Sequence, residues 1–438
     1  MPAASSDLSI GIDFGTSNTV VAIADPSGRV EAVTFEHDGA QLKVYVTALC
    51  FWDERHGNGR RTHVEGGPWA IEHFLDGLHA HRFIQSFKTF AASATFQETR
   101  IFRDRYRFED LLGAFLRTLI RHGGAAVDLT ARNVVVGRPV TFAGHNPDDA
   151  LAMQRYRSAF AGLGADTATY VYEPVGAAFF FARQLDHDAT VLVADFGGGT
   201  SDFSVMRFSR AAGVLKAEPL GHSGIGIAGD AFDYRIVDRV VSPRLGKGGS
   251  YRSMGKILTI PNHYYANFAR WNQLALMKGS GDLKELRELA RVAIDPAPLE
   301  KFIEIVDYDL GFALYRAVSN VKLALSSAEE ALFQFRGEGV DITAPVTRSD
   351  FEGWIADDVG KIAHTVDQAL AVAGVRAEEI ERVFLTGGTS FVPAIRRLFI
   401  DRFGETRLTS ADQFESIAYG LALIGQSDNP TQWAAGEP

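Results

Sequence analysis

Two stretches of the chain share a pattern in which apolar runs flank a short turn. In Leu8 to Val20, an apolar run ends in Asp13, and a turn that begins with Gly15 leads into a second run. In Val191 to Phe208, the first run ends in Asp195, and three consecutive glycines precede the returning run. Apolar runs on both sides of a short turn predict a β-hairpin. The repeated pattern predicts two similar lobes, each of which begins with such a hairpin.

The turn of the second hairpin contains more glycine than a hairpin needs. Gly197, Gly198 and Gly199 have no Cβ, so another group can come close to their backbone N–H donors. A concave row of such donors attracts an anion, most simply a phosphate. Asp195 would point into the same cleft, where a carboxylate and a phosphate repel each other unless a cation lies between them. We therefore predict Mg²⁺, held mainly through water; a tight hairpin with spare glycines is the alternative.

The segments between the two hairpins alternate between strand and helix patterns. Residues 29–52 and Asn133 to Thr141 are predicted to be strands, whereas Arg107 to His122 and Asp148 to Leu163 are predicted to be helices. The charged, glycine-bearing residues 53–67 predict a loop. This order of elements indicates an α/β lobe.

Glycines mark two further candidate ligand loops. Gly221 to Ala231 precedes a helical run from Phe232 to Val241, as in a phosphate loop that opens a helix. Arg382 to Phe399 predicts a strand, a diglycine and a helix. Nucleotides bind beyond the carboxyl ends of strands in such arrangements, although a diglycine can also be a plain connector.

The rest of the second half predicts mainly helices. Residues 242–301 predict a helical elaboration, in which the aromatic side chains of Tyr264, Tyr265, Phe268 and Trp271 belong to the core. Other predicted elements are a helix at Tyr308 to Leu325, a strand at Val340 to Val346, a capping box at Thr347 and Asp350 that opens a helix to about Ala373, a helix at Phe414 to Gly425, and a disordered tail at 426–438.

Composition narrows the classes of protein to which the chain can belong. Its 438 residues are 46% hydrophobic with a net charge of −10, so a large core and several domain-sized units are expected. The absence of a basic tract argues against nucleic acid as a partner. No apolar segment is long enough for a membrane span, and the N-terminus has no signal-peptide pattern. Because Cys50 is the only cysteine, we expect a cytoplasmic protein, and we expect it to be a monomer.

These blocks, in this order and spacing, resemble the actin-like ATPases. The most similar branch is the nucleotide-binding domain of the seventy-kilodalton heat-shock (DnaK-type) chaperones. The segments that carry this resemblance are Ile10 to Val20, Tyr172 to Ala178, Val191 to Val205, Ser223 to Asp233, Leu385 to Pro393 and Glu415 to Leu421. The resemblance implies two lobes, 1–188 and 189–425, each with a ribonuclease-H-like mixed sheet flanked by helices, and a nucleotide cleft between them.

The resemblance also implies roles for individual residues. Lys88 would position the attacking water, although a lone lysine in an apolar run is more often a snorkelling surface residue. Glu173 would be the carboxylate near the metal and the water, and Asp13 and Asp195 would hold the hydrated Mg²⁺. The residues implied to bind ATP or ADP are Gly15, Thr16, Ser17, Asn18, Gly197, Gly198, Gly199, Thr200, Gly229, Lys322, Ser326, Gly387, Gly388 and Phe391.

The chain also departs from that family's pattern. Leu323 and Phe391 stand where the family usually has arginines that flank the adenine, so base selectivity is open, and an aromatic or apolar clamp could stack the base. The hydrophobic linker and the β-rich peptide-binding domain do not follow the nucleotide-binding segments. The chain therefore resembles the truncated, YegD-type bacterial branch, and peptide clamping by the usual mechanism is not expected.

The expected function is a slow, Mg²⁺-dependent ATPase whose nucleotide state is a conformational switch for an unknown protein partner or client. A small-molecule kinase and a filament-forming scaffold of the same superfamily are alternatives. A kinase would need a catalytic base in a substrate cleft, and no sugar-kinase motif is present. A nucleotide-binding pseudo-enzyme is a further alternative, against which Asp13, Lys88, Glu173 and Asp195 argue.

Overall fold

The structure is a computed structural model that describes residues 7–56, 59–76, 81–130, 132–144, 146–182, 187–211, 214–277, 281–410 and 415–435. The chain forms two compact units. The first unit comprises Met1–Ala228, Lys361–Ser390 and Arg396–Pro438, and the second comprises Gly229–Gly360 and Phe391–Ile395. The two large sheets and both predicted hairpins belong to the first unit.

The first large sheet has the strand order β13-β12-β1-β2-β3, and β6 pairs with the end of β2. Three strands form an antiparallel meander, and two more run parallel to β1 on its other side. The strands are β1 (Ser9–Phe14), β2 (Asn18–Ala24), β3 (Val30–Ala32), β6 (Tyr45–Val46), β12 (Asn133–Arg138) and β13 (Thr169–Tyr172). The predicted hairpin at Leu8 to Val20 is thus confirmed.

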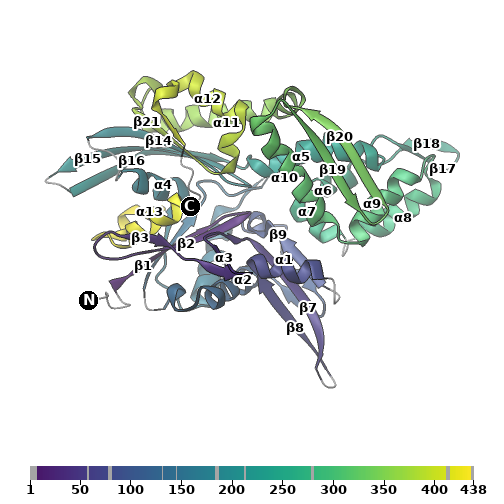
Figure 1. Ribbon diagram of the computed structural model, residues 1–438, viewed down its shortest axis with the longest axis horizontal. Helices are drawn as coiled ribbons and strands as arrows, with labels where there is room; N and C mark the ends of the chain where they lie inside the picture. The colour runs from purple at the N-terminus through teal and green to yellow at the C-terminus, as the bar shows by residue number, and fades with distance from the viewer. Residues whose placement is uncertain are drawn as a thin grey trace. The chain divides into compact units, whose positions relative to one another are not determined.

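The second large sheet repeats this plan in the order β16-β15-β14-β21-β22. Its meander begins with the second predicted hairpin, and two parallel strands again lie beside the first strand. The strands are β14 (Ala189–Phe196), β15 (Ser201–Ala211), β16 (Val214–Ile225), β21 (Arg382–Thr386) and β22 (Leu408–Ser410). In Figure 1, β14 and β21 lie side by side although they are far apart in the sequence. The sheets confirm the predicted α/β duplication, whereas the lobe boundary after residue 188 stays a prediction.

Two helices join the large sheets through close backbone contacts. A single cluster of buried side chains combines strands of both sheets with α4 (Glu173–Ala182) and α13 (Ser416–Gly425). A Cβ on Gly420 would lie only 1.7 Å from the backbone oxygen of Gly176, so the two helices cross backbone to backbone. A Cβ on Gly11 would lie 2.3 Å from the backbone oxygen of Ala418. Only glycine allows α13 to pack this closely on both α4 and β1.

The helices between the two predicted hairpins agree with the sequence pattern. α2 (Phe108–Gly123) and α3 (Asp149–Ala161) lie where helices were predicted, and the side chain of Asp148 caps the second of them. The shorter elements are β4 (Phe35–His37), β5 (Ala40–Leu42), α1 (Gly67–Asp76), β9 (His81–Gln85), η2 (Phe87–Phe90), β10 (Thr99–Ile101), β11 (Asp104–Tyr106) and η3 (Gly124–Val127).

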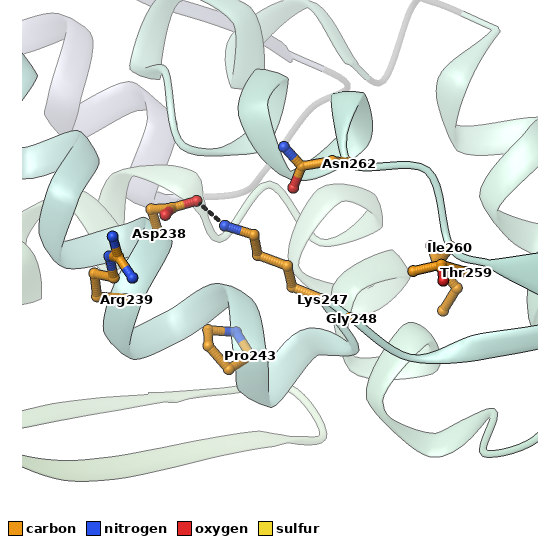
Figure 2. Close-up of a pocket in the computed structure, with 8 residues that line it drawn as sticks. All are labelled: Asp238, Arg239, Pro243, Lys247, Gly248, Thr259, Ile260 and Asn262. Atoms are coloured by element: carbon orange, nitrogen blue, oxygen red, sulfur yellow. Dashed lines mark hydrogen bonds and ion pairs between the residues drawn. The ribbon is translucent and has the colours of Figure 1, made fainter.

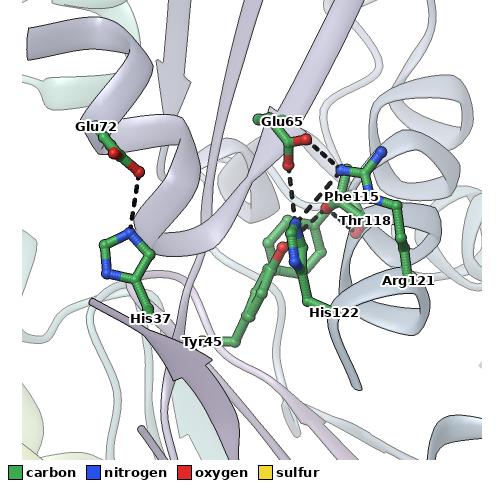
Figure 3. Close-up of polar contacts among 8 residues, drawn as sticks. All are labelled: His37, Tyr45, Glu65, Glu72, Phe115, Thr118, Arg121 and His122. Carbon is green, nitrogen blue, oxygen red and sulfur yellow. Dashed lines mark hydrogen bonds and ion pairs between the residues drawn. The ribbon is translucent and has the colours of Figure 1, made fainter. Parts of the chain in front are cut away.

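The predicted loop at 53–67 was wrong. β7 (Ala48–His56) continues through its first residues, and β8 (Gly59–Gly66) forms a hairpin with it. The charged residues are strand residues because their side chains find partners on neighbouring elements. Glu65 at the end of β8 pairs with Arg121 and His122 of α2 (Figure 3). Figure 3 also shows Tyr45 directed at Thr118 of α2, to which its hydroxyl donates at 3.1 Å.

Cys50 lies on β7 and is fully buried. Burial raises the pKa of its thiol to about 12, so the group is protonated at neutral pH. Its side chain packs with Ala48 and Ala70 in a small apolar cluster. Cys50 is therefore a small core residue and an unreactive thiol.

The second unit is mainly helical but contains two hairpins of its own. The predicted helical elaboration at 242–301 missed β17 (Ser250–Ser253) and β18 (Lys256–Thr259), because their residues do not alternate clearly between apolar and polar. The four predicted core aromatics of this segment are buried. The other elements are α5 (Gly229–Ile236), a π-helical turn (Val237–Val241), η5 (Ser242–Leu245), α6 (His263–Phe268), α7 (Trp271–Met277), α8 (Asp282–Val292), α9 (Ala297–Asp307), α10 (Gly311–Ser327), β19 (Glu330–Gly337) and β20 (Val340–Thr347).

The capping box after β20 is confirmed, because the backbone N–H of Asp350 donates to Thr347 Oγ1 at 3.0 Å. It opens α11 (Arg348–Ala373), which runs from the second unit into the first. The strand, diglycine and helix at Arg382 to Phe399 are also confirmed, as β21, η7 (Gly388–Phe391) and α12 (Pro393–Phe403). Among the described residues, no helix combines the length and apolarity that a membrane crossing requires.

The prediction of a disordered tail at 426–438 was wrong as far as Ala435. η9 (Pro430–Trp433) follows α13, and the indole of Trp433 is buried against Phe179 of α4. The backbone N–H of Ala435 donates to the oxygen of Tyr170 on β13 at 2.8 Å. Burial of one large aromatic ring is enough to order a short polar segment, which its composition alone did not indicate.

We expect Gly420→Ala to lower the free energy of unfolding by about 3 kcal/mol, because the new methyl group would overlap the backbone of α4. Urea unfolding followed by circular dichroism measures this change. Gly353→Ala is the matched control, since it also lies in a helix and its new methyl group would meet nothing within 4 Å. The control should be neutral or stabilise by up to about 1 kcal/mol. Equal effects of the two substitutions would contradict the proposed helix crossing.

Candidate functional site

The turns of the two large hairpins lie next to each other. A Cβ on Gly199 would stand 3.2 Å from Thr16 Oγ1, so the second turn approaches the first closely. In the first turn, a Cβ on Gly15 would lie 2.2 Å from the oxygen of Asn18, which restricts this position to glycine. In the second, the N–H of Gly197 donates to the oxygen of Thr200 at 2.9 Å and closes the turn. Most of the predicted phosphate-binding residues therefore come together.

The other residues of the two turns complete this arrangement. Ser17 accepts a hydrogen bond from the N–H of Thr47 through its backbone oxygen at 2.8 Å, while Asn18 is exposed. Gly198 lies at the tip of the second turn between Gly197 and Gly199. The turns thus lie together, and the binding of an anion by their backbone donors stays a prediction.

Lys88 and Glu173 form a buried ion pair beside the hairpins. Lys88 Nζ lies 2.7 Å from Glu173 Oε1, and the two side chains are only 7% and 5% exposed. Burial alone would lower the pKa of Lys88, but Glu173, Tyr156 and Asp13 reverse this effect and raise it. Lys88 is therefore charged and held in place, which excludes a snorkelling surface role.

The backbone that carries Lys88 is fixed from the opposite side. Lys88 lies in η2, which begins directly after Ser86. The φ of 54° at Ser86 turns the chain sharply before this helix. The guanidinium of Arg155 on α3 donates to the backbone oxygens of Phe90, Ala91, Ser93 and Phe96. Glu173 is accommodated because β12 has Gly137 at the facing position, where a Cβ would lie 3.1 Å from Glu173 Cγ. Both partners of the ion pair thus sit on rigid supports.

Each of the two hairpins has an aspartate near the end of its first strand, Asp13 in β1 and Asp195 in β14, and both carboxyls interact electrostatically with the ion pair. Burial and Glu173 raise the pKa of Asp13 well above its usual range, against the opposing effect of Lys88. Burial and Glu173 also raise the pKa of Asp195 to about 7, although a hydrogen bond from Thr386 and the charge of Lys88 oppose the rise. These two carboxyls therefore share one electrostatic environment with Glu173 and Lys88.

Asp202 adds a carboxylate to which the sequence reasoning gave no role. It lies directly opposite Asp195 in the hairpin register, so the two side chains share one face. Its Oδ1 accepts hydrogen bonds from the N–H groups of Val140 at 2.8 Å and Thr141 at 3.3 Å. Burial raises the pKa of Asp202 well above its usual range. A four-residue turn between two aspartates was the signal that could have identified this pair.

The cluster has the chemistry of a cation site. The ammonium of Lys88 interacts with the carboxyls of Glu173, Asp13 and Asp195. Asp202 Oδ2 and the hydroxyl of Tyr156 have no hydrogen-bond partner in the described part of the chain. Across the residues that the structure describes, no three acidic, histidine or cysteine side chains converge closely enough to ligate a metal directly. Mg²⁺ retains several water ligands in many protein sites, so the donor set fits a hydrated Mg²⁺ held by Asp13 and Asp195.

The diglycine lies beside the second hairpin. Gly387 has a φ of 79°, and a Cβ there would lie 2.0 Å from the backbone oxygen of Phe196, so β21 can turn away from β14 only at a glycine. A Cβ on Gly388 would meet nothing within 4 Å, which leaves the backbone open to a ligand. Thr386, just before the diglycine, hydrogen-bonds to Asp195. The diglycine is thus joined to the acidic cluster by one side chain.

The other predicted nucleotide contacts belong to the second unit. Lys322 Nζ lies 2.7 Å from Asp233 Oδ1 and 3.3 Å from the backbone oxygen of Gly229, so two of the predicted residues meet at the start of α5. Ser326 donates to the backbone oxygen of Lys322 one helical turn earlier. Phe391 is 41% exposed. The roles of these residues in binding a nucleotide stay predictions.

Comparisons with known proteins show similarity to the Hsp70 proteins. A family model described as "Hsp70 protein" matches residues 310–434. The chain is 25% identical to the chaperone protein DnaK of Thermotoga neapolitana over 94% of its own length. It is 24% identical to DnaK of Deinococcus radiodurans over the same share, and 28% identical to the chaperone protein HscA of Serratia proteamaculans over 70% of its length. The chain is thus similar to the Hsp70 proteins over most of its length. The actin-like fold class implied by the sequence motifs is confirmed with it.

The similarity to the Hsp70 proteins covers nearly all of this chain but only part of its relatives. The aligned region spans 58% of each of the two DnaK proteins and 39% of HscA.

The acidic cluster predicts an unusual pH dependence of stability in metal-free protein. The Asp195 carboxyl ionises near 3.8 in the unfolded chain but keeps its proton to about pH 7 when folded. The unfolded state therefore binds fewer protons between these values, and stability should fall as the pH rises from about 4 to about 7. Asp195→Asn should reduce this fall by on the order of 4 kcal/mol, since the shift from 3.8 to about 7 spans about three pKa units of about 1.4 kcal/mol each.

Urea unfolding in a chelating buffer at several pH values tests this expectation. Asp166→Asn is the control, because the side chain of Asp166 is exposed and outside the cluster. Above pH 7, added Mg²⁺ should raise the free energy of unfolding of the wild-type protein. The increase should be smaller for Asp195→Asn. A pH profile of Asp195→Asn that matches wild type would rule out this contribution.

We expect Lys88→Met to lower the free energy of unfolding by about 3–5 kcal/mol, because Glu173 would remain buried beside two other acids without its partner. The double variant Lys88→Met with Glu173→Gln should regain much of this loss, since it removes the unpaired charge as well. Urea unfolding of the two single variants and the double variant gives the coupling energy. Additive losses would show that the two side chains do not depend on each other.

Proposed function

We propose that the chain binds MgATP, with the phosphates at the two glycine hairpins of the first unit, and hydrolyses it slowly. The observation that carries this proposal is the meeting of both turns with Lys88, Glu173 and the aspartates in one buried cluster. A cluster with this excess of acid is stabilised by a cation, and its neighbouring backbone donors suit an anion. MgATP supplies both charges in one ligand. The resemblance to Hsp70 nucleotide-binding domains implies the same ligand.

Each group has a distinct part in the proposed reaction. The backbone N–H groups around Gly15 and Gly197 to Gly199 would bind the phosphates and stabilise the charge that develops during phosphoryl transfer. Lys88 would hold the attacking water near the terminal phosphate, and Glu173 would orient both Lys88 and this water. Mg²⁺, when bound, would neutralise the phosphate oxygens, with Asp13 and Asp195 holding its water shell. Because Lys88 is already paired with Glu173, little reorganisation would be needed for its role.

The nucleoside part of the ligand would contact less polar groups. Gly387 and Gly388 offer an open backbone, and we assign Gly229, Lys322 and Ser326 to the adenosine as the resemblance implies. Phe391 and Leu323 are 41% and 70% exposed, and both can stack on a base without forming hydrogen bonds to it. Such contacts discriminate weakly between bases, so we propose that GTP binds within about tenfold of ATP, a difference of about 1.4 kcal/mol.

We further propose that the bound nucleotide acts as a conformational switch read by a protein partner, as in a chaperone cycle. ATP and ADP differ in the phosphate that the second turn would contact, and a ligand shifts a conformational equilibrium only through such differential contacts. Limited trypsin digestion in the presence of ATP or ADP tests the switch. Different cleavage patterns with the two nucleotides would support it, and identical patterns would exclude it.

We expect purified protein to release phosphate from ATP slowly and only with Mg²⁺, and Asp195→Ala to lower that rate by about 100-fold. Glu173→Gln should lower the rate similarly but retain ATP binding in calorimetry, because its proposed role is to orient the water. Phosphate release by single turnover measures both effects, and Asp166→Ala is the control. An unchanged rate in Asp195→Ala, with its circular dichroism intact, would refute the site.

A further inference from the structure

One stretch of the second unit differs sharply in charge from the rest of the chain. Residues 239–281 contain no aspartate or glutamate, whereas the whole chain has 54 and a net charge of −10. The same stretch contributes lysines and arginines at Arg239, Arg244, Lys247, Arg252, Lys256, Arg270 and Lys278. Within this stretch, Arg252 and Lys256 are exposed on the hairpin at residues 250–259, which carries no acidic residue. A local excess of positive charge of this kind attracts an acidic partner.

The hairpin at the centre of this stretch has an open edge. β17 pairs with β18 on one side, and Tyr251 forms a bridge to Ala293 on the other. β18 pairs with no other strand in the part of the chain that the structure describes, and all four of its residues are exposed. An open strand edge presents backbone donors and acceptors to which an extended peptide can add as a further strand.

The same hairpin exposes apolar side chains. Met254 at its tip is fully exposed with a φ of 49°, although asparagine or glycine is the usual residue in such a turn. Ile257 on β18 is 63% exposed, and Ile294, next to the bridge, is 51% exposed. Because the backbone of Met254 is in the left-handed region and its side chain is fully exposed, this residue buries no apolar surface in the folded unit. Apolar side chains gathered on one exposed hairpin are typical of an interaction surface.

A pocket of about 420 Å³ lies at the end of β18. Figure 2 shows Lys247 extending from the pocket toward Asp238, with which it forms an ion pair, while Thr259 and Ile260 lie on the other side. Arg239 also lines the pocket and has no ion-pair partner in the described part of the chain. The pocket therefore combines apolar contact with one uncompensated positive charge.

We propose that the outer edge of β18 binds an extended peptide segment that presents both acidic and apolar residues on each of its faces, with an acidic side chain seated in the pocket near Arg239. Arg252 lies opposite Ile257 on one face of the hairpin, and Lys256 shares the other face with Leu258. Successive side chains of an added strand point to opposite faces, so each set would meet one basic and one apolar side chain. The open edge favours a polypeptide over an anionic lipid surface, because only a polypeptide pairs with a strand. This surface is separate from the proposed nucleotide site and does not depend on it.

The test uses the full chain and a fluorescein-labelled octapeptide that repeats two glutamates and two valines, so that each face of the extended peptide carries both residue types. We expect fluorescence anisotropy to show saturable binding that weakens as salt is raised, since exposed charges are screened. Peptides with lysine in place of glutamate, or with serine in place of valine, should bind at least about tenfold more weakly, a loss of about 1.4 kcal/mol. Equal binding of the three peptides would overturn the proposal.

Charge reversal locates the surface. Arg252→Glu with Lys256→Glu should weaken binding of the glutamate–valine peptide at least about tenfold, and Ile257→Ser should weaken it without changing its salt dependence. Arg316→Glu with Arg336→Glu is the matched control, because these exposed residues of the second unit give the same change in net charge. Thermal unfolding checks that each variant folds. Unchanged peptide binding in the first double variant would refute the site.

Vesicles separate the two classes of anionic partner. The chain should not sediment with vesicles of phosphatidylcholine that contain one third phosphatidylserine. Sedimentation with these vesicles that is lost in the Arg252→Glu and Lys256→Glu variant, without binding of the glutamate–valine peptide, would replace the peptide proposal by a lipid surface.

Discussion

The buried ion pair between Lys88 and Glu173 is the interaction on which the candidate site depends. It places a permanent positive charge among carboxyls whose pKa values are raised by burial and by one another. Each carboxyl was brought there by a different element, so the cluster exists only when the first sheet, the second sheet and α4 are all folded. The stability of the first unit therefore depends on the charge of any ligand that binds at this site.

The close crossing of α4 and α13 explains how elements far apart in the sequence reach this cluster. Glycines at the crossing and on β1 let two helices fill the space that bulkier residues would keep open. Glu173 stands at the first residue of α4, so the position of the helix fixes the position of its carboxylate. Packing and electrostatics are therefore set by the same helix.

The sequence predicted the parts of the fold that depend on local patterns. Both hairpins, the helices at Phe108 and Asp149, and the diglycine turn followed from apolar periodicity and glycine placement. The hairpin after Ala48 was missed because its charged side chains find partners such as Arg121, which are distant in the sequence. The ordered turn at Trp433 was also missed, because the ring packs against Phe179, which is distant in the sequence. Asp202 was within reach, since the hairpin register alone sets it opposite Asp195, whereas the orientation of Tyr156 depends on tertiary packing.

The burial of Cys50 has a practical consequence for studying the two units. Its thiol is covered by the core and stays protonated at neutral pH, so alkylating dyes should pass it by in the folded protein. A pair of cysteines introduced on the surface, one in each unit, would then be the only groups to take up spectroscopic labels. Spin or fluorophore separations could be recorded on an otherwise unaltered chain, without first building a cysteine-free background.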